Sequence, residues 1–173
     1  MSTRRDEPTD AIDAIDAIDV ARQEWARVHP DLDTTPMDVS GRLRMVAAAL
    51  ARATEPTVRA EGLTRPEFDV LSAVRRGRVP LTPTGIAAAT LSSGAATTKR
   101  LDHLTGVGYL QRTPDERDGR VTRLSLTPAG AELIDRLLPQ VLAAEHRFAA
   151  DLDEDRQRDL ASGLRVLLRG NGF

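Results

Sequence analysis

The sequence predicts a mainly α-helical fold with one small two-stranded sheet. Apolar residues recur at helical spacing along most of the chain, and three Thr-Pro pairs, at 35–36, 82–83 and 127–128, have the pattern of a helix start. Only the stretch from Tyr109 to Leu126 changes to strand-like patterning, around a polar tip. A short helix, a turn and a second helix directly precede this hairpin, and that order of elements is typical of a winged helix-turn-helix.

Four segments follow from this reading: a flexible tail, N-terminal helices, the winged helix-turn-helix and C-terminal helices. Their predicted bounds are 1–10, 11–60, 61–127 and 128–173. The first and last helices are too apolar along one face to remain in water. We therefore expect both chain ends to build the interface of a homodimer.

The N-terminal helices open on three copies of Ala-Ile-Asp at residues 11–19. This repeat is either a partly helical tail expansion or the beginning of a dimer-clasping helix that continues through Trp25. His29-Pro30 should end that helix, because the residue before a proline avoids helical backbone angles. A second helix is expected from Thr35-Pro36, with Thr35 as its N-cap, and Pro56 and Gly62 are expected to break it.

The helix-turn-helix is marked by capping residues. A capping box at 64–67, Thr-Arg-Pro-Glu, opens a helix that Gly77 closes. Thr82 caps a short helix, and Ser92 or Ser93 caps the next one, which ends at Gly106. The remaining elements are strands at 109–112 and 121–126, a long helix from Thr127-Pro128 and a last helix that begins near Asp153.

Composition excludes several classes of function. The chain has no cysteine, which excludes disulfides, thiol nucleophiles, cysteine-ligated zinc and thiol redox sensing, and which fits a cytoplasmic location. No apolar run approaches the ~20 residues that span a bilayer, and the N-terminus lacks the apolar region of a signal peptide, so we expect no membrane association. The three histidines lack ligand spacing, and we expect no metal. Nucleotide-binding and hydrolase motifs are missing, so we expect neither a cofactor nor an enzyme.

Positive charge is concentrated in the predicted helix-turn-helix and hairpin. The whole chain has a formal net charge of −2, but residues 92–123 contain six basic and four acidic residues, so that the rest of the chain carries −4. This distribution argues against a generally basic nucleic-acid binder and favours a local contact.

The helix after the turn has features of a DNA recognition helix. Its predicted outward side chains are small or polar, which lets a helix approach base edges, and threonine offers both a hydroxyl and a methyl group. In the hairpin, a tip arginine can enter a narrow minor groove while a nearby aspartate holds its guanidinium. An ordinary solvated helix and hairpin are the alternatives. The candidate DNA-binding residues are Ser93, Thr97, Thr98, Lys99, Arg117, Asp118, Arg120 and Arg123.

The run SSGAATTKRLDHLTGVGYLQRTPDERDGRVTRLSLTPAG resembles the DNA-binding core of the MarR family of bacterial transcription regulators. The resemblance extends over roughly residues 35–170. It implies a dimeric regulator, most often a repressor, that binds double-stranded DNA at half-sites about 10–10.5 base pairs apart. It also implies that Arg120 is the minor-groove arginine and Asp118 its partner. The sequence departs from the family at His103 and Thr105, where relatives usually carry Arg and Glu.

A narrower resemblance rests on Trp25 and on the runs PDLDTTPMDVSGRLR and GLTRPEFDVLSAVRR. These are similar to the branch that contains the urate-responsive PecS-like regulators and the citrate- and trans-aconitate-responsive TamR. The resemblance implies a ligand site at Trp25, Asp69, Arg76 and Arg100 for a small organic anion: urate, citrate, trans-aconitate or a phenolic acid. Two guanidinium groups can bind such an anion bidentately, and an indole can stack on it.

Two alternatives stand beside these assignments. Trp25 can be a core or interface aromatic, and Asp69 and Arg76, two helical turns apart, can form a structural ion pair. For the chain as a whole, the alternative to a DNA-binding regulator is a winged-helix protein–protein interaction module that does not bind DNA. Charge reversal at Arg120 would separate the two.

Overall fold

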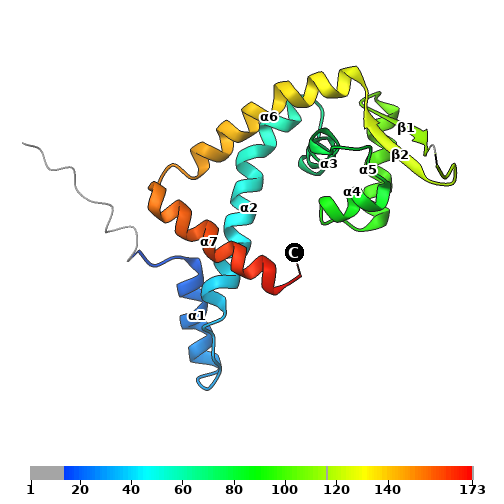
Figure 1. The fold of residues 1–173 in the computed structure, drawn as a ribbon. Helices are drawn as coiled ribbons and strands as arrows, with labels where there is room; N and C mark the ends of the chain where they lie inside the picture. The colour runs from blue at the N-terminus through cyan, green and yellow to red at the C-terminus, as the bar shows by residue number, and fades with distance from the viewer. Residues whose placement is uncertain (1–13, 116, 173) are drawn as a thin grey trace, which may run out of the picture. The chain divides into compact units, whose positions relative to one another are not determined.

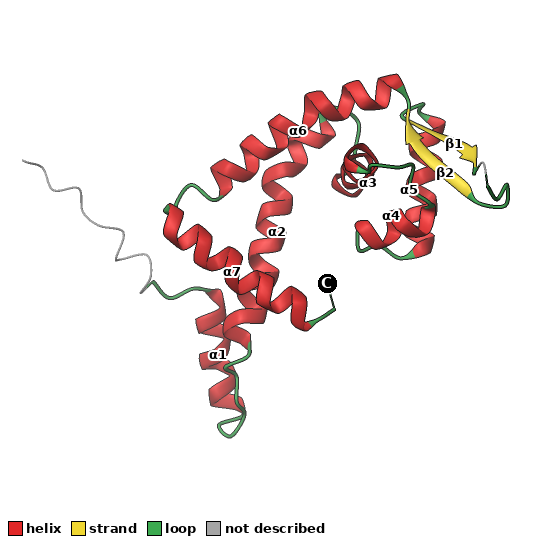
Figure 2. Ribbon diagram, in the orientation of Figure 1, coloured by secondary structure: helices red, strands yellow, loops and turns green. Residues whose placement is uncertain are grey.

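The computed structural model of the protein describes residues 14–115 and 117–172. Within these ranges the chain forms seven helices and one hairpin, in the order α1 to α5, β1, β2, α6 and α7 (Figures 1 and 2). The chain divides into two compact units, and the boundary between them lies after Ala49, inside helix α2. The predicted tail, residues 1–10, and the start of the Ala-Ile-Asp repeat lie outside the described residues. None of the described helices has the length and apolar content needed to cross a bilayer.

Helix α1 (Ala17–Val28) begins inside the Ala-Ile-Asp repeat. The Asp16 carboxylate accepts hydrogen bonds from the backbone N–H groups of Ile18 and Asp19, at 2.7 and 3.1 Å. In return, the Asp19 carboxylate accepts the Asp16 N–H at 3.0 Å. This capping box satisfies the first N–H groups of the helix and fixes where it starts. The helix ends before His29, as the following proline predicts.

Helix α2 (Met37–Arg59) begins one residue after the predicted Thr35-Pro36 start. In the N-terminal unit, the Arg42 guanidinium contacts the carboxylates of Asp16 and Asp19, both at 2.8 Å. The Ile18 side chain is buried and packs directly on Gly41, where a Cβ atom would lie 2.6 Å from Ile18 Cδ1. The last two copies of the repeat therefore bind the beginning of α2, so this part of the repeat is not an unconstrained tail.

The predicted break of α2 at Pro56 is wrong, because the helix continues to Arg59. A proline inside a helix loses one backbone hydrogen bond and crowds the preceding turn. Here Thr54 and Val58, on either side of Pro56, are completely buried in the C-terminal unit. Their burial offsets the lost hydrogen bond and keeps the last turn helical.

Helices α3 (Arg65–Arg76), α4 (Pro83–Ala89) and α5 (Gly94–Gly106) form the helix-turn-helix region. Their N-termini are those that the capping residues predict. The Glu67 carboxylate accepts the Thr64 N–H at 2.8 Å, Thr82 Oγ1 accepts the Gly85 N–H at 3.1 Å, and Ser93 caps α5. Between α4 and α5, Leu91 adopts φ +52°, in the left-handed region.

Strands β1 (Leu110–Pro114) and β2 (Thr122–Leu126) form an antiparallel hairpin, the wing, with Leu110 opposite Leu126. One contact was not predicted. Leu81, just before α4, exchanges two backbone hydrogen bonds with Leu124, of 3.3 and 2.8 Å. The wing is thereby attached to the start of the helix-turn-helix, beside α4 and α5 (Figure 1).

Helices α6 (Pro128–Phe148) and α7 (Glu154–Gly170) complete the C-terminal unit. Gly130, in the first turn of α6, packs on the backbone of Tyr109 so closely that a Cβ atom would overlap the Tyr109 carbonyl oxygen. By contrast, α7 buries none of its residues and leaves Leu160, Leu167 and Leu168 exposed. The core of the unit lies among α3, α4, α5, α6 and the wing. Its fully buried side chains include Leu71, Ile86, Leu101, Leu104, Leu110, Leu124, Ile134 and Leu137.

Candidate DNA-binding surface and effector cleft

Helix α5 exposes part of the predicted DNA-binding set. Ser93, Thr98 and Lys99 are exposed, as expected. Thr97 is not, because it is only 1% exposed and its hydroxyl donates to the Ser93 carbonyl at 3.0 Å. Thr97 shares its helix face with the buried residues Leu101 and Leu104, at positions i+4 and i+7. The prediction that Thr97 faces outward is therefore wrong.

The C-terminal half of α5 is fastened to two other elements. His103 Nδ1 lies 2.6 Å from Glu67 Oε1 in α3, and Arg112 in β1 donates to the Asp102 carboxylate at 2.7 Å. Burial of the Glu67 carboxyl acts to raise its pKa. The hydrogen bonds from Thr64 and the contact with His103 outweigh that effect, so the pKa of Glu67 lies below its usual value. Glu67 thus caps α3 with one oxygen and positions α5 with the other.

The wing tip is organised by Asp115. Its carboxylate accepts the backbone N–H groups of Arg117 and Asp118, at 2.9 and 3.1 Å, and the Arg123 guanidinium at 2.5 Å. The Arg123 guanidinium, followed by these two N–H groups, lowers the pKa of Asp115. Arg123 also donates to the Pro80 carbonyl at 3.3 Å, which connects the wing to the loop before α4.

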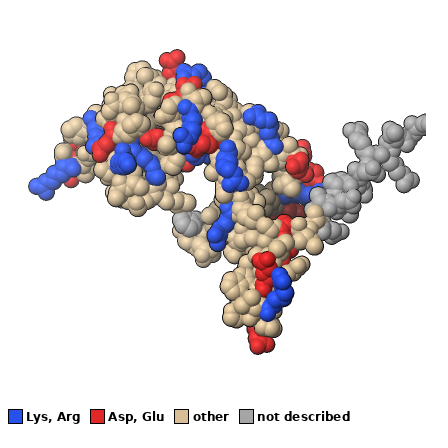
Figure 3. Space-filling model, turned by 180° about the vertical axis from the view of Figure 1, so that it is seen from behind, with Lys and Arg blue, Asp and Glu red and all other residues tan. Residues whose placement is uncertain are grey.

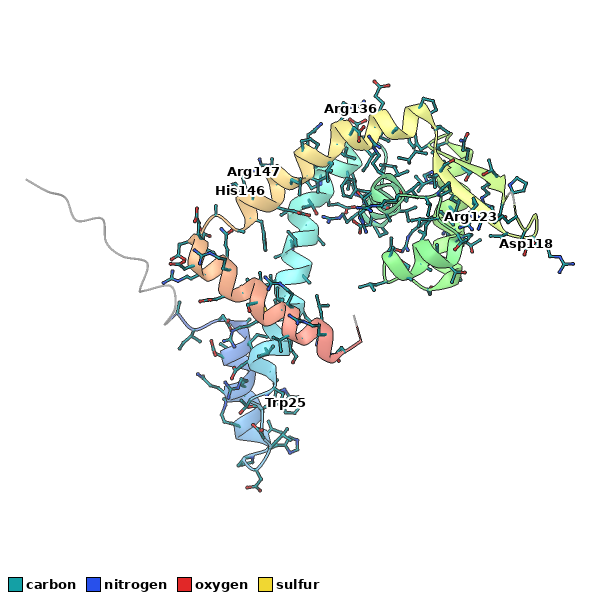
Figure 4. All side chains as sticks on the ribbon, in the orientation of Figure 1. Trp25, Asp118, Arg123, Arg136, His146 and Arg147 are labelled. Carbon is teal, nitrogen blue, oxygen red and sulfur yellow. The ribbon has the colours of Figure 1, made fainter. Side chains whose placement is uncertain are left out.

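Asp118 interacts with Arg120 through the backbone. Its carboxylate accepts the Arg120 N–H at 3.0 Å, and within the described ranges no ion pair holds the Arg120 guanidinium. Asp118 lies near the wing tip and Arg123 further back along β2 (Figure 4). Seen from behind, basic side chains project from the wing end, at the left of Figure 3. In the described part of the chain, Lys99, Arg117 and Arg120 are all exposed and form no ion pair with a carboxylate.

A cleft of about 300 Å³ lies between α3 and α6. Asp69 and Arg76 both line it, so the structure brings together two of the four predicted ligand residues. They do not form the alternative ion pair, because Asp69 is paired with Arg65, one turn away, at 3.0 Å. The apolar lining of the cleft comes from Phe68, Ile134, Leu138, Val141 and Leu142.

Arg65 lines this cleft and joins three helices. Its guanidinium donates to Asp69 in α3, to the Thr54 hydroxyl in α2 at 3.1 Å, and to the Glu145 carboxylate in α6 at 3.0 Å. It also lies over the Phe68 ring, 5.4 Å from the ring centre. Burial acts to lower the pKa of Arg65, but the two carboxylates raise it. One cation of the cleft, Arg65, is therefore already paired with two carboxylates.

The other two predicted ligand residues are not among those that line this cleft. Arg100, in α5, donates to the Ser92 hydroxyl at 2.8 Å and does not line the cleft. Trp25 belongs to the N-terminal unit, where its ring stacks on that of His29 with 5.8 Å between the centres. It is 46% exposed and lines a separate pocket of about 210 Å³ with Leu32 and Met37.

Sequence reasoning missed Arg65, Asp115 and the contact between Glu67 and His103. For Arg65 a signal was present, because Asp69 follows it at the i+4 spacing of helical ion pairs. The partners of the other residues lie in different elements, and spacing along the chain carries no such information. Among residues 14–115 and 117–172, no group of three or more His, Asp or Glu side chains is placed to hold a metal ion.

Comparisons with known proteins agree with this architecture. A model of the MarR family matches residues 61–121. The HTH-type transcriptional regulator PecS of Dickeya dadantii (strain 3937) is 33% identical over 140 residues, which cover 80% of this chain and 84% of PecS. A mutant MarR from E. coli complexed with operator DNA has a TM-score of 0.68 and 24% identity, covering 83% of this chain and 97% of that one. For Bordetella bronchiseptica BpsR, whose structure concerns regulation of DNA binding by 6-hydroxynicotinic acid, the TM-score is 0.72 with 20% identity, over 79% of this chain and 96% of that one.

Proposed function

The chain belongs to the MarR family of transcriptional regulators, and from this we propose that it acts as a homodimeric repressor that releases a pseudo-palindromic operator when a small organic anion binds. DNA binding is a property of the family. The repression, the dimer and the anion are our proposals.

The observation that carries the proposal is the set of free cations at α5 and the wing. Lys99, Arg117 and Arg120 are exposed, and within the described residues no carboxylate neutralises them. Cations without an internal partner are available to phosphate groups, whose neutralisation releases counterions from DNA. Two protomers would supply six such cations, so the logarithm of the association constant should fall with the logarithm of salt concentration with a slope of about −5.

Support for a dimer comes from the apolar surface of α7. This helix buries none of its residues and exposes Leu160, Val166, Leu167 and Leu168. Apolar patches of this kind in a helical unit mark association surfaces. Light scattering should give the mass of a dimer, and Leu167→Asp should shift the protein towards the monomer.

For the effector, the cleft between α3 and α6 offers Arg76 beside an apolar wall. A carboxylate on an aromatic or aliphatic body fits this combination, because the anion can bind the guanidinium while the body lies against Leu138 and Leu142. Ser72 also lines the cleft, and its buried hydroxyl has no hydrogen-bond partner in the described part of the chain. A regulating aromatic acid is named for BpsR, which shares the fold.

The contacts around the cleft give the anion a physical route to the DNA-binding surface. An anion in the cleft would compete with Asp69 and Glu145 for Arg65, which holds α3 against α6. Helix α3 in turn carries Glu67, which contacts His103 in α5. A small shift of α3 would therefore displace the recognition helix, and the anion and the operator would weaken each other's binding reciprocally.

The test is fluorescence anisotropy on the upstream intergenic DNA of the protein's own gene, at several salt concentrations. Arg120→Gln should reduce the slope by about 2 per dimer. Arg147→Gln is the matched control and should leave the slope unchanged, because Arg147 is an exposed arginine of α6 that, within the described residues, forms no ion pair. Arg120→Glu should abolish binding while the dimer persists. A slope near zero for the wild type would contradict DNA binding through these cations and favour the protein-interaction alternative.

The effector is tested on the same DNA with urate, citrate, trans-aconitate and a phenolic acid. Arg76→Ala should keep DNA binding and lose the response to the active anion. Arg78→Ala is the control, because Arg78 lies two residues further along but outside this cleft. An unchanged response in Arg76→Ala would remove the cleft as the effector site.

A further inference from the structure

The turn between α4 and α5 holds an apolar side chain in solvent. Leu91 is 69% exposed, and its φ of +52° lies in the left-handed region, where a Cβ atom is crowded by the backbone. Across the described residues, no other non-glycine residue has a positive φ. Glycine at this position would avoid both the strain and the exposed apolar surface. Folding alone therefore does not account for a leucine here, and strained backbone of this kind is common at functional sites.

Hydrogen bonds fix Leu91 in its conformation. The Leu91 N–H donates to the Ala88 carbonyl at 3.3 Å, which closes the end of α4. The next residue, Ser92, accepts hydrogen bonds from the Thr90 hydroxyl at 3.1 Å and from the Arg100 guanidinium at 2.8 Å. Arg100 belongs to α5, so the backbone of the turn that carries Leu91 is tied to the recognition helix.

The exposed leucine is continuous with the DNA-binding surface. Leu91 directly precedes Ser92 and Ser93 at the N-terminus of α5, the end of a recognition helix that meets base edges in this class of motif. In the major groove, the apolar feature of a base edge is the 5-methyl group of thymine. We propose that Leu91 is a specificity-determining residue, which contacts a thymine 5-methyl group in each half-site of the bound DNA. This inference rests on the proposed binding of a pseudo-palindromic operator.

The first test compares stability with affinity in Leu91→Gly. The probe is the duplex that the wild-type dimer selects from a random-sequence DNA pool. The variant should unfold at the same or a higher temperature than the wild type, because the strain is removed. Its dissociation constant for the duplex should rise about tenfold. Val107→Ala, at the other end of α5 and 48% exposed, is the control, with a change below about twofold.

The second test assigns the partner group. Uracil lacks only the 5-methyl group of thymine, so each symmetric pair of thymines in the duplex is replaced by uracil in turn. One replacement should weaken wild-type binding about tenfold and leave Leu91→Gly nearly unaffected, since the contact is already lost. Unchanged affinity of Leu91→Gly, or equal uracil effects on both proteins at every position, would overturn the assignment. If the wild type itself selects no duplex, the proposed function fails, and this inference fails with it.

Discussion

Two glycines that look equivalent in the sequence should respond in opposite directions to the same substitution. Gly130 and Gly85 each stand three residues after the threonine of a Thr-Pro helix start, in α6 and α4. Helix propensity favours alanine over glycine by up to about 1 kcal/mol at either position. The surroundings differ, because a Cβ at Gly85 meets only Thr82 Oγ1 at 3.4 Å and Leu81 Cδ2 at 4.0 Å. A Cβ at Gly130 would overlap the Tyr109 carbonyl oxygen and lie 2.9 Å from the Tyr109 carbonyl carbon.

The cost of Gly130→Ala follows from what must move. The obstructing atoms are backbone, so no rotamer change relieves the contact, and restoring an ordinary separation from the carbonyl oxygen requires a shift of about 1.3 Å. That shift would stretch two hydrogen bonds of Thr127, to the Tyr109 carbonyl at 3.1 Å and to the Gly108 carbonyl at 2.7 Å. Overpacking costs about 1–3 kcal/mol and each hydrogen bond about 1 kcal/mol, against a propensity gain of at most about 1 kcal/mol. We expect a net destabilisation of about 2–4 kcal/mol.

Urea unfolding followed by circular dichroism measures both variants, at one protein concentration because association contributes to stability. Gly85→Ala should be neutral or more stable by up to about 1 kcal/mol, and Gly130→Ala should lose about 2–4 kcal/mol. A Gly130→Ala protein as stable as the wild type would refute the close packing of α6 on the wing.

Three further outcomes are expected from single side chains. Asp115→Ala should weaken DNA binding in anisotropy measurements, because Arg123 and the wing tip lose their common acceptor. The substitution also removes a negative charge from the DNA-binding surface, so tighter binding would mean that charge outweighs positioning. In the folded protein the pKa of Glu67 is lowered from 4.5. The ionised carboxylate therefore adds its full contribution to the free energy of unfolding above about pH 4.5, and this contribution is lost as the pH falls through the lower pKa of the folded state. The stability difference between wild type and Glu67→Gln should therefore shrink below pH 4.5 in urea titrations, and a difference that is constant with pH would contradict this. Arg65→Lys should lower the free energy of unfolding by about 1–2 kcal/mol, since an ammonium group cannot replace the contacts of the guanidinium to Asp69, Thr54 and Glu145. An unchanged value in thermal or urea unfolding would show that these contacts are not stabilising.

Local chemistry made most of the fold predictable. Thr82, Ser93, Thr127 and Asp153 each cap a helix with a side-chain oxygen, and such a cap depends on only three or four consecutive residues. The prediction failed at Pro56, where burial of distant parts of the chain against α2 overrides a local breaker. Propensity cannot anticipate that effect, because it contains no term for tertiary packing.

The candidate site was less predictable because its contacts cross between elements. Thr97 was expected to face outward as a polar residue, yet it lies on the buried stripe of α5 and satisfies its hydroxyl within the helix. Asp118 was the expected partner of a wing guanidinium, whereas Asp115 has that role toward Arg123. Both aspartates lie within a few residues of two arginines, and only the fold of the hairpin decides which pairs form.

The capping box of α1 has a consequence for how the length of this gene can vary. The box and its contact with Arg42 use only the sequence Asp-Ala-Ile-Asp that precedes Val20. Loss or gain of one Ala-Ile-Asp copy by replication slippage would leave those four residues unchanged before Val20. The tandem repeat therefore lets the coding sequence shrink or grow in steps of nine nucleotides without altering the helix start, a neutral variation that selection on the folded unit would not remove.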